Sequence, residues 1–181
     1  MESVIDSTEL TNGKGEAASE LDDFLATTIP RQIEAEEALH NGDVAPRMEM
    51  WSTQDPVTLF GGWGPCKSGW EDVSSTFLWV ASRFSNGSEY EFELFAAGVS
   101  GDLAYTVGYE RQTVSVDGAP PEPNVLRVTH VYRREHGEWK IVHRHGDHLP
   151  LRSESPCRGE DLEDSNNRVH EGGAWKAPRP L

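Results

Sequence analysis

The sequence is poor in cysteine and has no long apolar run. Its two cysteines, Cys66 and Cys157, are about ninety positions apart. This spacing argues against a disulfide framework and is compatible with a reducing compartment. No apolar stretch approaches the roughly 20 residues that span a membrane. The first ten residues lack the basic and apolar regions of a signal peptide. We therefore expect a soluble, cytoplasmic protein.

The sequence also has few positively charged residues. Asp and Glu together number 31 against 16 Lys and Arg, which gives a formal net charge of -15. A chain with this balance repels phosphate backbones and anionic lipid surfaces, and no basic stripe offsets it. The composition therefore predicts no nucleic-acid partner and no membrane partner.

The hydropathy pattern predicts a lead-in, one domain and a tail. Residues 1–18 are polar and patternless, and residues 150–181 are rich in Gly and Pro, so both are predicted to be disordered or extended. The domain spans residues 19–149. Ser19 and Asp22 resemble a capping box at the start of a helix.

From residue 21 to 40 the apolar positions fall on one side of a helical wheel, with Pro30 predicted to kink or break the helix. Gln32 and Glu36 project into the apolar stripe if the helix continues in phase. A polar side chain on a buried face is either satisfied by a neighbour or directed at a cavity. Glu36 is thus a candidate cavity residue.

The next segments predict helices first and strands afterwards. We expect a short helix at residues 44–52, a strand at 57–62, a helix at 70–84, and then four longer antiparallel strands from residue 89 onward. This order predicts an α+β domain with helices gathered on one face of an antiparallel sheet. Gly108, inside a strand, predicts a bulge or a close approach. Glu110 and Arg127 are expected to pair on the outer face of that sheet.

Five of the seven histidines lie in residues 126–148, two alternating runs joined by a short turn at Gly137. This pattern predicts an antiparallel hairpin. By alternation, His130 lies on the apolar face of the first strand, and His143 and His145 lie on the apolar face of the second. An imidazole on an apolar wall can act as a general acid or base near neutral pH.

Three strings carry a family resemblance: WSTQDPVTLFGG, SGDLAYTVGYERQ and LRVTHVYRREHGEWKIVHRHGD. With the segment order, they resemble the SnoaL-like branch of the nuclear transport factor 2-like superfamily, which has a cystatin-like, ketosteroid isomerase-like fold. The resemblance covers about residues 21–149. It implies a cone-shaped curved sheet around N-terminal helices, an apolar pocket, and homodimers packed through the outer sheet face. Known activities of the family include isomerases, cyclases and dehydratases.

The resulting hypothesis is a pocket for a small apolar organic ligand, with cofactor-independent proton transfer next to a carbonyl group. His145 is the expected acid or base, Asp147 orients it, and His130 is a second proton-transfer group. The expected substrate-binding residues are His143, Glu36, Trp63, Tyr109 and Asp55. Asp55 precedes a proline and could equally cap a helix or turn, and each histidine could be a neutral core residue.

Two alternatives remain open at this stage. One is a non-catalytic ligand-binding or dimerisation module with the same fold. The other is a metallohydrolase, because His143, His145, Asp147 and His148 have an HxHxDH spacing. A zinc ion there needs a further ligand from elsewhere in the chain. Because the motif ends the domain instead of opening a longer chain, no metal is expected.

Overall fold

The computed structural model describes residues 7–148, with side chains from residue 20 onward. The elements are α1 (Ser7–Leu39), α2 (Ala45–Met50), β1 (Thr58–Phe60), β2 (Cys66–Ser68), α3 (Trp70–Ala81), β3 (Phe84–Ser100), β4 (Leu103–Val116), β5 (Glu122–Glu135) and β6 (Glu138–His148). This order confirms the predicted α+β fold. The predicted tail at residues 150–181 lies outside the described residues.

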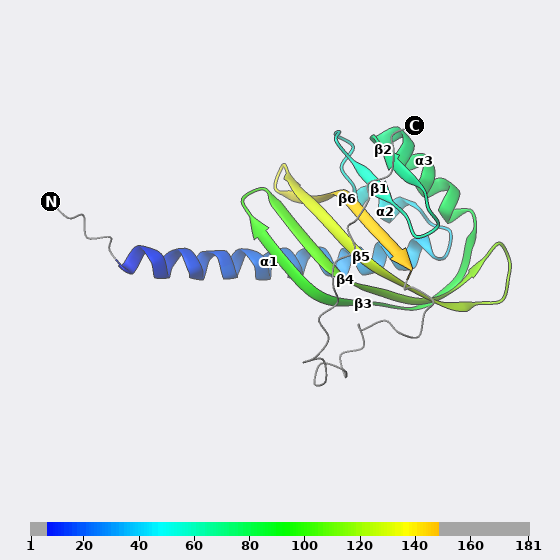
Figure 1. The fold of residues 1–181 in the computed structure, drawn as a ribbon, viewed down its shortest axis with the longest axis horizontal. Coiled ribbons are helices and arrows are strands. Elements are labelled where there is room, and N and C mark those ends of the chain that lie inside the picture. The colour runs from blue at the N-terminus through cyan, green and yellow to red at the C-terminus, as the bar shows by residue number, and fades with distance from the viewer. Residues whose placement is uncertain (1–6, 149–181) are drawn as a thin grey trace, which may run out of the picture. The chain divides into compact units, whose positions relative to one another are not determined.

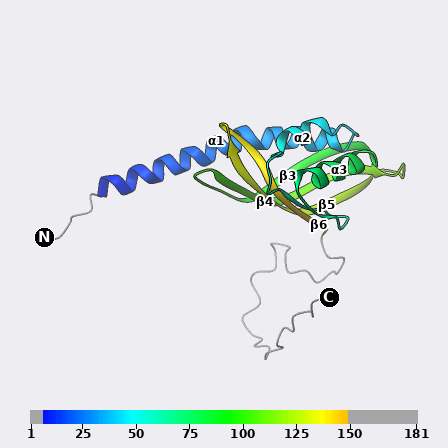
Figure 2. The same ribbon diagram turned by 90° about the horizontal axis from the view of Figure 1, so that it is seen from above.

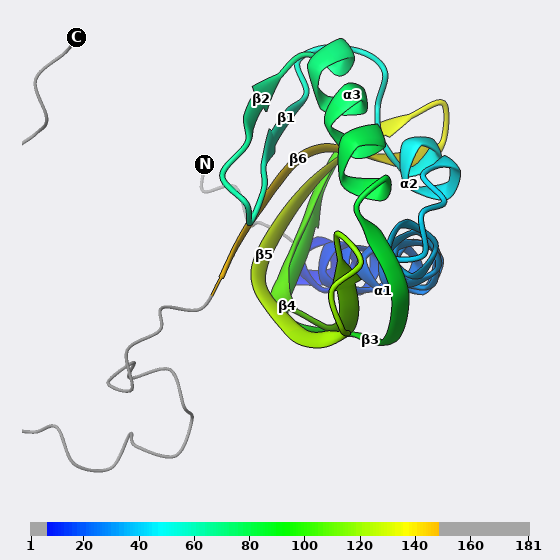
Figure 3. The ribbon, with the colours of Figure 1, turned by 90° about the vertical axis from the view of Figure 1, so that its right-hand side faces the viewer.

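One six-stranded sheet has the order β2-β1-β6-β5-β4-β3. Every pair is antiparallel except β1 with β6, which is parallel. The sheet curls without closing, and α1 and α3 lie inside its concave face (Figures 1 and 3). We call this concave side the inner face and the opposite side the outer face. None of the helices in the described part of the chain has the length and apolar character of a membrane span.

Helix α1 is longer than the sequence pattern predicts. It begins at Ser7, so residues 7–18 of the predicted lead-in belong to the helix. Its N-terminal half extends past the edge of the sheet (Figures 1 and 2). The helix also continues through Pro30 without a break. The predicted phase therefore survives, and Gln32 and Glu36 are both buried.

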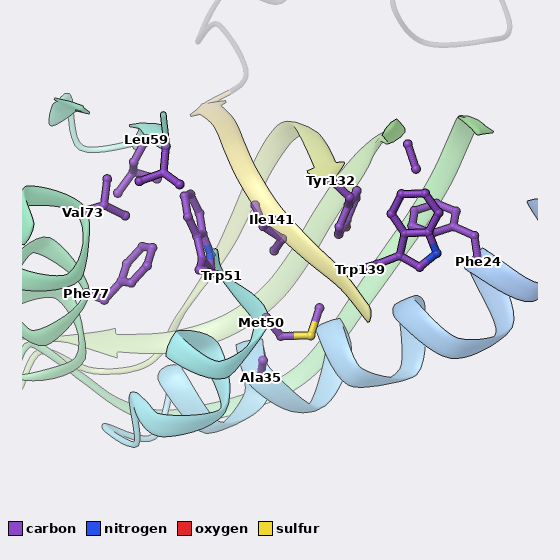
Figure 4. Packing of buried hydrophobic residues seen from close by; sticks show 12 residues of the cluster. Phe24, Ala35, Met50, Trp51, Leu59, Val73, Phe77, Tyr132, Trp139 and Ile141 are labelled. Carbon is purple, nitrogen blue, oxygen red and sulfur yellow. The ribbon is translucent and has the colours of Figure 1, made fainter. Parts of the chain in front are cut away.

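The core fills the space between the inner face and the helices (Figure 4). Phe24 on α1 contacts Tyr132 and Trp139 edge to face, with ring centroids 5.1 and 5.2 Å apart. Trp51, after α2, packs against Phe77 of α3 at 4.9 Å. Such aromatic pairs add about 1 kcal/mol each beyond the area they bury. The first set holds α1 against β5 and β6, and the second holds α3 against the segment that follows α2.

A bulge changes which β6 side chains face inward. Val131 pairs with His143 but the next residue, Tyr132, pairs with Ile141, so Val142 has no partner in the β5–β6 ladder. An extra residue in one strand reverses the alternation beyond it. Trp139 and Ile141 are therefore buried, whereas beyond the bulge Arg144 is buried instead of His143 and His145. The predicted inward placement of these two histidines is wrong for this reason.

Strand β4 departs from its predicted facing as well. Ala104, Thr106, Glu110, Gln112 and Val114 are buried on the inner face, while the more apolar alternate set, which includes Tyr109, faces outward. Gly108 makes the close approach that its position predicts, because a Cβ there would lie 2.3 Å from the carbonyl oxygen of Glu93. Here the polar side chains are inside because they surround a cavity.

Candidate functional site

The inner face encloses a cavity of about 70 Å³. This volume has room for roughly five water molecules. Its apolar lining comes from Leu39, Leu59, Phe77, Val80, Phe84 and Leu126, and its polar lining from Glu36, His40, Arg47, Thr76, Glu110, Gln112, Asn124, Arg144 and His148. Concave sites of this kind, mostly apolar with a few convergent polar groups, are typical of small-molecule binding. We call it the inner cavity.

Two buried arginine–carboxylate pairs form its polar wall. Arg144 of β6 donates to Glu110 Oε2 of β4, and their side chains are 6 % and 1 % exposed. Arg47 of α2 donates to Glu36 Oε1 of α1, and both are equally buried. The Nε atom of each arginine has no hydrogen-bond partner among the described residues. The same is true of Glu110 Oε1. Two donors and one acceptor of the residues that form this wall thus have no partner among the described residues.

The electrostatics of Glu110 follow from its neighbours. Burial raises the pKa of its carboxyl, but the nearby charges of Arg144 and Arg47, together with the hydrogen bond from Arg144, outweigh that effect, so its pKa lies below the usual value. Glu110 is thus ionised at neutral pH. Burial lowers the pKa of Arg47 to about 9, with Arg144 also lowering it. Glu110 and Arg47 are therefore both charged near pH 7.

Two histidines lie close to these pairs. His40 lines the cavity, its Nδ1 has no partner among the described residues, and burial lowers its pKa to about 4. His130 is fully buried, with Nε2 3.8 Å from Glu110 Oε1, and burial lowers its pKa to about 3. Both rings are therefore neutral near pH 7. His40 contacts the cavity directly, whereas His130 lies behind Glu110.

The mouth of the cavity is bounded by the loop after β1, which contains Trp63. The Trp63 side chain lines the cavity and is partly exposed. Its ring contacts Phe84 at 5.0 Å and Trp79 at 5.9 Å. The Arg83 guanidinium lies over both indoles, 4.9 Å from Trp63 and 4.7 Å from Trp79. Asp117 holds this guanidinium through two hydrogen bonds.

Of the site residues predicted from the sequence, two line the inner cavity. Glu36 and Trp63 do so, and His130 lies next to the cavity without lining it. The sequence pattern did not indicate Glu110, Arg144, Arg47 and His40 as site residues. It expected Glu110 to pair with Arg127 outside the sheet, but Glu110 pairs with Arg144 and Arg127 pairs with Asp147. A polar stripe on α1 ending at His40 is the only sequence signal that includes one of the missed residues.

Four of the other predicted residues, His143, His145, Asp147 and Tyr109, lie on the outer face. His143 Nδ1 is 2.7 Å from the hydroxyl of Thr58, and the rings of His143 and His145 both contact Phe60. His145, Asp147 and Tyr109 border a second, shallow hollow of about 200 Å³. Because of the bulge in β6, His143, His145 and Asp147 lie on the opposite side of the sheet from the inner cavity. A catalytic role for His145 and Asp147 remains a prediction, but it would have to operate on this face.

Asp55 has a structural position. Its Oδ1 accepts a hydrogen bond from the backbone N–H of Trp70 at 3.0 Å, at the first turn of α3. A carboxylate there satisfies a free amide and interacts favourably with the helix dipole. Asp55 does not line the inner cavity. In residues 7–148 no three side chains of the metal-binding types are grouped closely enough to hold a metal ion.

Comparison with known proteins gives the family. Residues 6–149 match the SnoaL-like domain, so this chain belongs to the SnoaL-like domain family. No curated protein matches it significantly. The fold recurs in a nuclear transport factor 2-like superfamily protein from Salmonella enterica serovar Typhimurium, which is 18 % identical with a TM-score of 0.60 and covers 80 % of this chain and 99 % of that one.

Two further solved structures have the same fold. A protein of Streptomyces avermitilis, proposed to be a dehydratase of the nuclear transport factor 2-like family, is 21 % identical with a TM-score of 0.58, over 71 % of this chain and 98 % of that chain. An uncharacterised cystatin-like protein of Caulobacter vibrioides is 16 % identical with a TM-score of 0.54, over 73 % and 92 %. At these identities the likeness establishes the fold alone.

Proposed function

We propose that this domain binds a small, uncharged carbonyl compound in the inner cavity and catalyses proton transfer next to the carbonyl group. The observation that carries the proposal is the set of unpartnered polar atoms on residues that line a cavity with apolar side chains on its other parts. A carbonyl oxygen can accept a hydrogen bond from Nε of Arg144 or Arg47, and Glu110 Oε1 can accept a proton from the adjacent carbon. The resemblance to a proposed dehydratase agrees with this reaction class.

The proposed reaction needs a base and a group that polarises the carbonyl, and the two ion pairs supply both. A carboxylate with a lowered pKa is present as the base at pH 7, but it is a weak base. Arginine N–H groups directed at the carbonyl oxygen compensate, because they stabilise the negative charge that develops there when the carbon loses its proton. Glu110 is thus the proposed proton acceptor, in place of the histidines favoured by the sequence pattern. Arg144 and Arg47 are the proposed electrophilic groups.

The test is exchange of hydrogen for deuterium next to the carbonyl of 2-butanone in D2O, followed by NMR. This exchange reports proton transfer directly and needs no knowledge of the natural substrate. We expect the protein to accelerate exchange and Glu110→Gln to lose about 100-fold or more of that acceleration. The matched control is Asp147→Asn, which alters the exposed outer pair and should exchange like the unmodified protein. Circular dichroism checks that each variant is folded.

The possible outcomes separate the two function classes. Equal exchange by Glu110→Gln and the unmodified protein would remove Glu110 from the mechanism. Binding of 2-butanone, seen as a raised unfolding midpoint, without any exchange would favour the non-catalytic binding module. Absence of both binding and exchange would refute the proposal as a whole.

The homodimer implied by the family resemblance is a second proposal. Its support is the exposure of Leu94, Phe95, Leu103 and Tyr105 on the neighbouring strands β3 and β4, because exposed apolar surface commonly marks an interface. Sedimentation equilibrium tests it, and Phe95→Asp should shift the protein toward a monomer. A monomer in the unmodified protein would reject this proposal and leave the cavity proposal intact.

A further inference from the structure

We infer that the aromatic side of the cavity mouth, formed by Trp63 and Trp79, binds the apolar body of the ligand whose carbonyl group enters the inner cavity. We call these two indoles the mouth subsite. The inference rests on the proposed binding of a carbonyl compound and adds where the rest of that molecule lies. It makes the ligand a two-part molecule with a small polar head and a longer uncharged hydrocarbon portion.

Size is the first argument. The cavity of about 70 Å³ has room for roughly five water-sized groups. A molecule larger than a very small ketone therefore extends through the mouth. The cavity is bounded there by Trp63, whose side chain is 38 % exposed. The first surface that an emerging chain meets on this side is aromatic.

The two sides of the mouth differ in polarity. Asn124 and His148 line the cavity from β5 and β6 and offer polar groups. The loop after β1 and helix α3 contribute aromatic surface instead, because the Trp63 ring meets the Trp79 ring at 5.9 Å and Trp79 is 45 % exposed. Apolar surface is removed from water more favourably against the indoles, so an emerging hydrocarbon chain lies on the tryptophan side.

The indoles are already fixed in position. Arg83 lies over both rings, and Asp117 holds its guanidinium through two hydrogen bonds. Because little side-chain freedom remains to be lost, binding on these rings costs less ordering entropy than binding on mobile side chains. Asp117 also neutralises the charge of Arg83, so the subsite does not select an anion. The strongly acidic chain disfavours anionic ligands further.

The test measures dissociation constants for a homologous series from 2-butanone to 2-nonanone by calorimetry. 2-Butanone has about the size that the cavity accommodates. If the mouth subsite binds the emerging chain, affinity keeps rising by roughly two- to fourfold per added methylene beyond 2-butanone. If the chain emerges into water, affinity becomes constant once the cavity is full, and the inference is wrong.

Two variants on α3 localise the effect. Trp79→Ala removes the outer indole without touching the cavity lining, so it should weaken 2-nonanone binding about tenfold and leave 2-butanone unchanged. Leu78→Ala is the matched control, because Leu78 is a neighbouring exposed apolar residue that does not line the cavity. It should leave both ketones unchanged. An equal loss for the two ketones in Trp79→Ala, or a loss as large in Leu78→Ala, would overturn the subsite.

The failures are distinguishable. Binding of 2-butanone with no dependence on chain length refutes the mouth subsite and leaves the cavity function standing. No binding of any ketone refutes the proposed function, and the subsite with it. Circular dichroism on each variant excludes loss of folding as the cause of a weaker affinity.

Discussion

The two faces of the sheet carry the same type of ion pair in opposite environments. On the inner face Arg144 of β6 pairs with Glu110 of β4, and both side chains are almost fully buried. On the outer face Arg127 of β5 pairs with Asp147 of β6, and both side chains are 45 % exposed. In water the attraction between two such charges is largely offset by hydration, whereas inside the domain each charge depends on its partner. The two pairs have similar residues and differ in burial. Burial therefore makes the inner pair costly to desolvate and makes each of its charges depend on the other.

The largest expected effect comes from removing the arginine of each pair. Arg144→Met leaves the Glu110 carboxylate buried without its partner, which should lower the free energy of unfolding by about 3–5 kcal/mol. Arg127→Met exposes Asp147 to solvent and should cost less than about 1 kcal/mol. Urea denaturation of the two variants measures both values.

A third variant sharpens this comparison. Combining Arg144→Met with Glu110→Gln removes the unpaired charge and should recover part of the stability lost in Arg144→Met, because an uncharged buried pair has no ion to desolvate. Equal losses for Arg144→Met and Arg127→Met would mean that the inner pair is hydrated, contrary to its burial.

The sequence could predict the parts of the fold that depend on local periodicity. The buried side of α1 and the alternation of Leu126, Val128, His130 and Tyr132 on β5 follow directly from apolar spacing, and both are confirmed. The family strings add the curved sheet. These features are predictable because each residue's environment is set by its near neighbours in the chain.

The inner site could not be predicted in the same way. The bulge at Val142 arises from long-range pairing, since β6 must match β5 on one side and β1 on the other. Nothing local in the sequence reports that pairing, so the histidines were assigned to the wrong face. On β4 the more apolar alternate set faces outward because Glu110 and Gln112 surround the cavity. Alternation alone assigns the apolar set to the core and fails wherever a cavity is polar.

Glycine replacements give the second comparison between the faces. A Cβ at Gly108 would lie 2.3 Å from the backbone carbonyl oxygen of Glu93, which cannot move without disturbing the β3–β4 ladder. At Gly98 the Cβ would instead meet the ring of Tyr105, an exposed side chain that can rotate away. Gly108→Ala should therefore cost about 2 kcal/mol or more, and Gly98→Ala under about 1 kcal/mol. Thermal unfolding of both variants measures these losses of stability. Equal losses would mean that the close contact at Gly108 does not strain the inner face more than the contact at Gly98 strains the outer face.

The smallest expected effect is a pH dependence that belongs to the inner face. Burial lowers the pKa of His130 to about 3 and that of His40 to about 4, against about 6.5 in the unfolded chain. Below pH 6.5 the unfolded chain therefore binds protons that the folded domain does not, and the free energy of unfolding falls as the pH falls. Between pH 6.5 and 5 each histidine should contribute about 1.5 kcal/mol to this fall.

Replacing His130 with Gln removes one of these contributions, so the fall in unfolding free energy between pH 6.5 and 5 should become shallower by about 1.5 kcal/mol. His143 on the outer face provides the comparison. Burial lowers its pKa as well, with His145 contributing, but the ring is only partly buried and contacts the Thr58 hydroxyl. His143→Gln should therefore flatten the dependence less than His130→Gln does. Urea denaturation at a series of pH values measures both slopes. A larger change in His143→Gln would mean that water reaches His130, and would reverse the contrast between a dry inner face and a hydrated outer one.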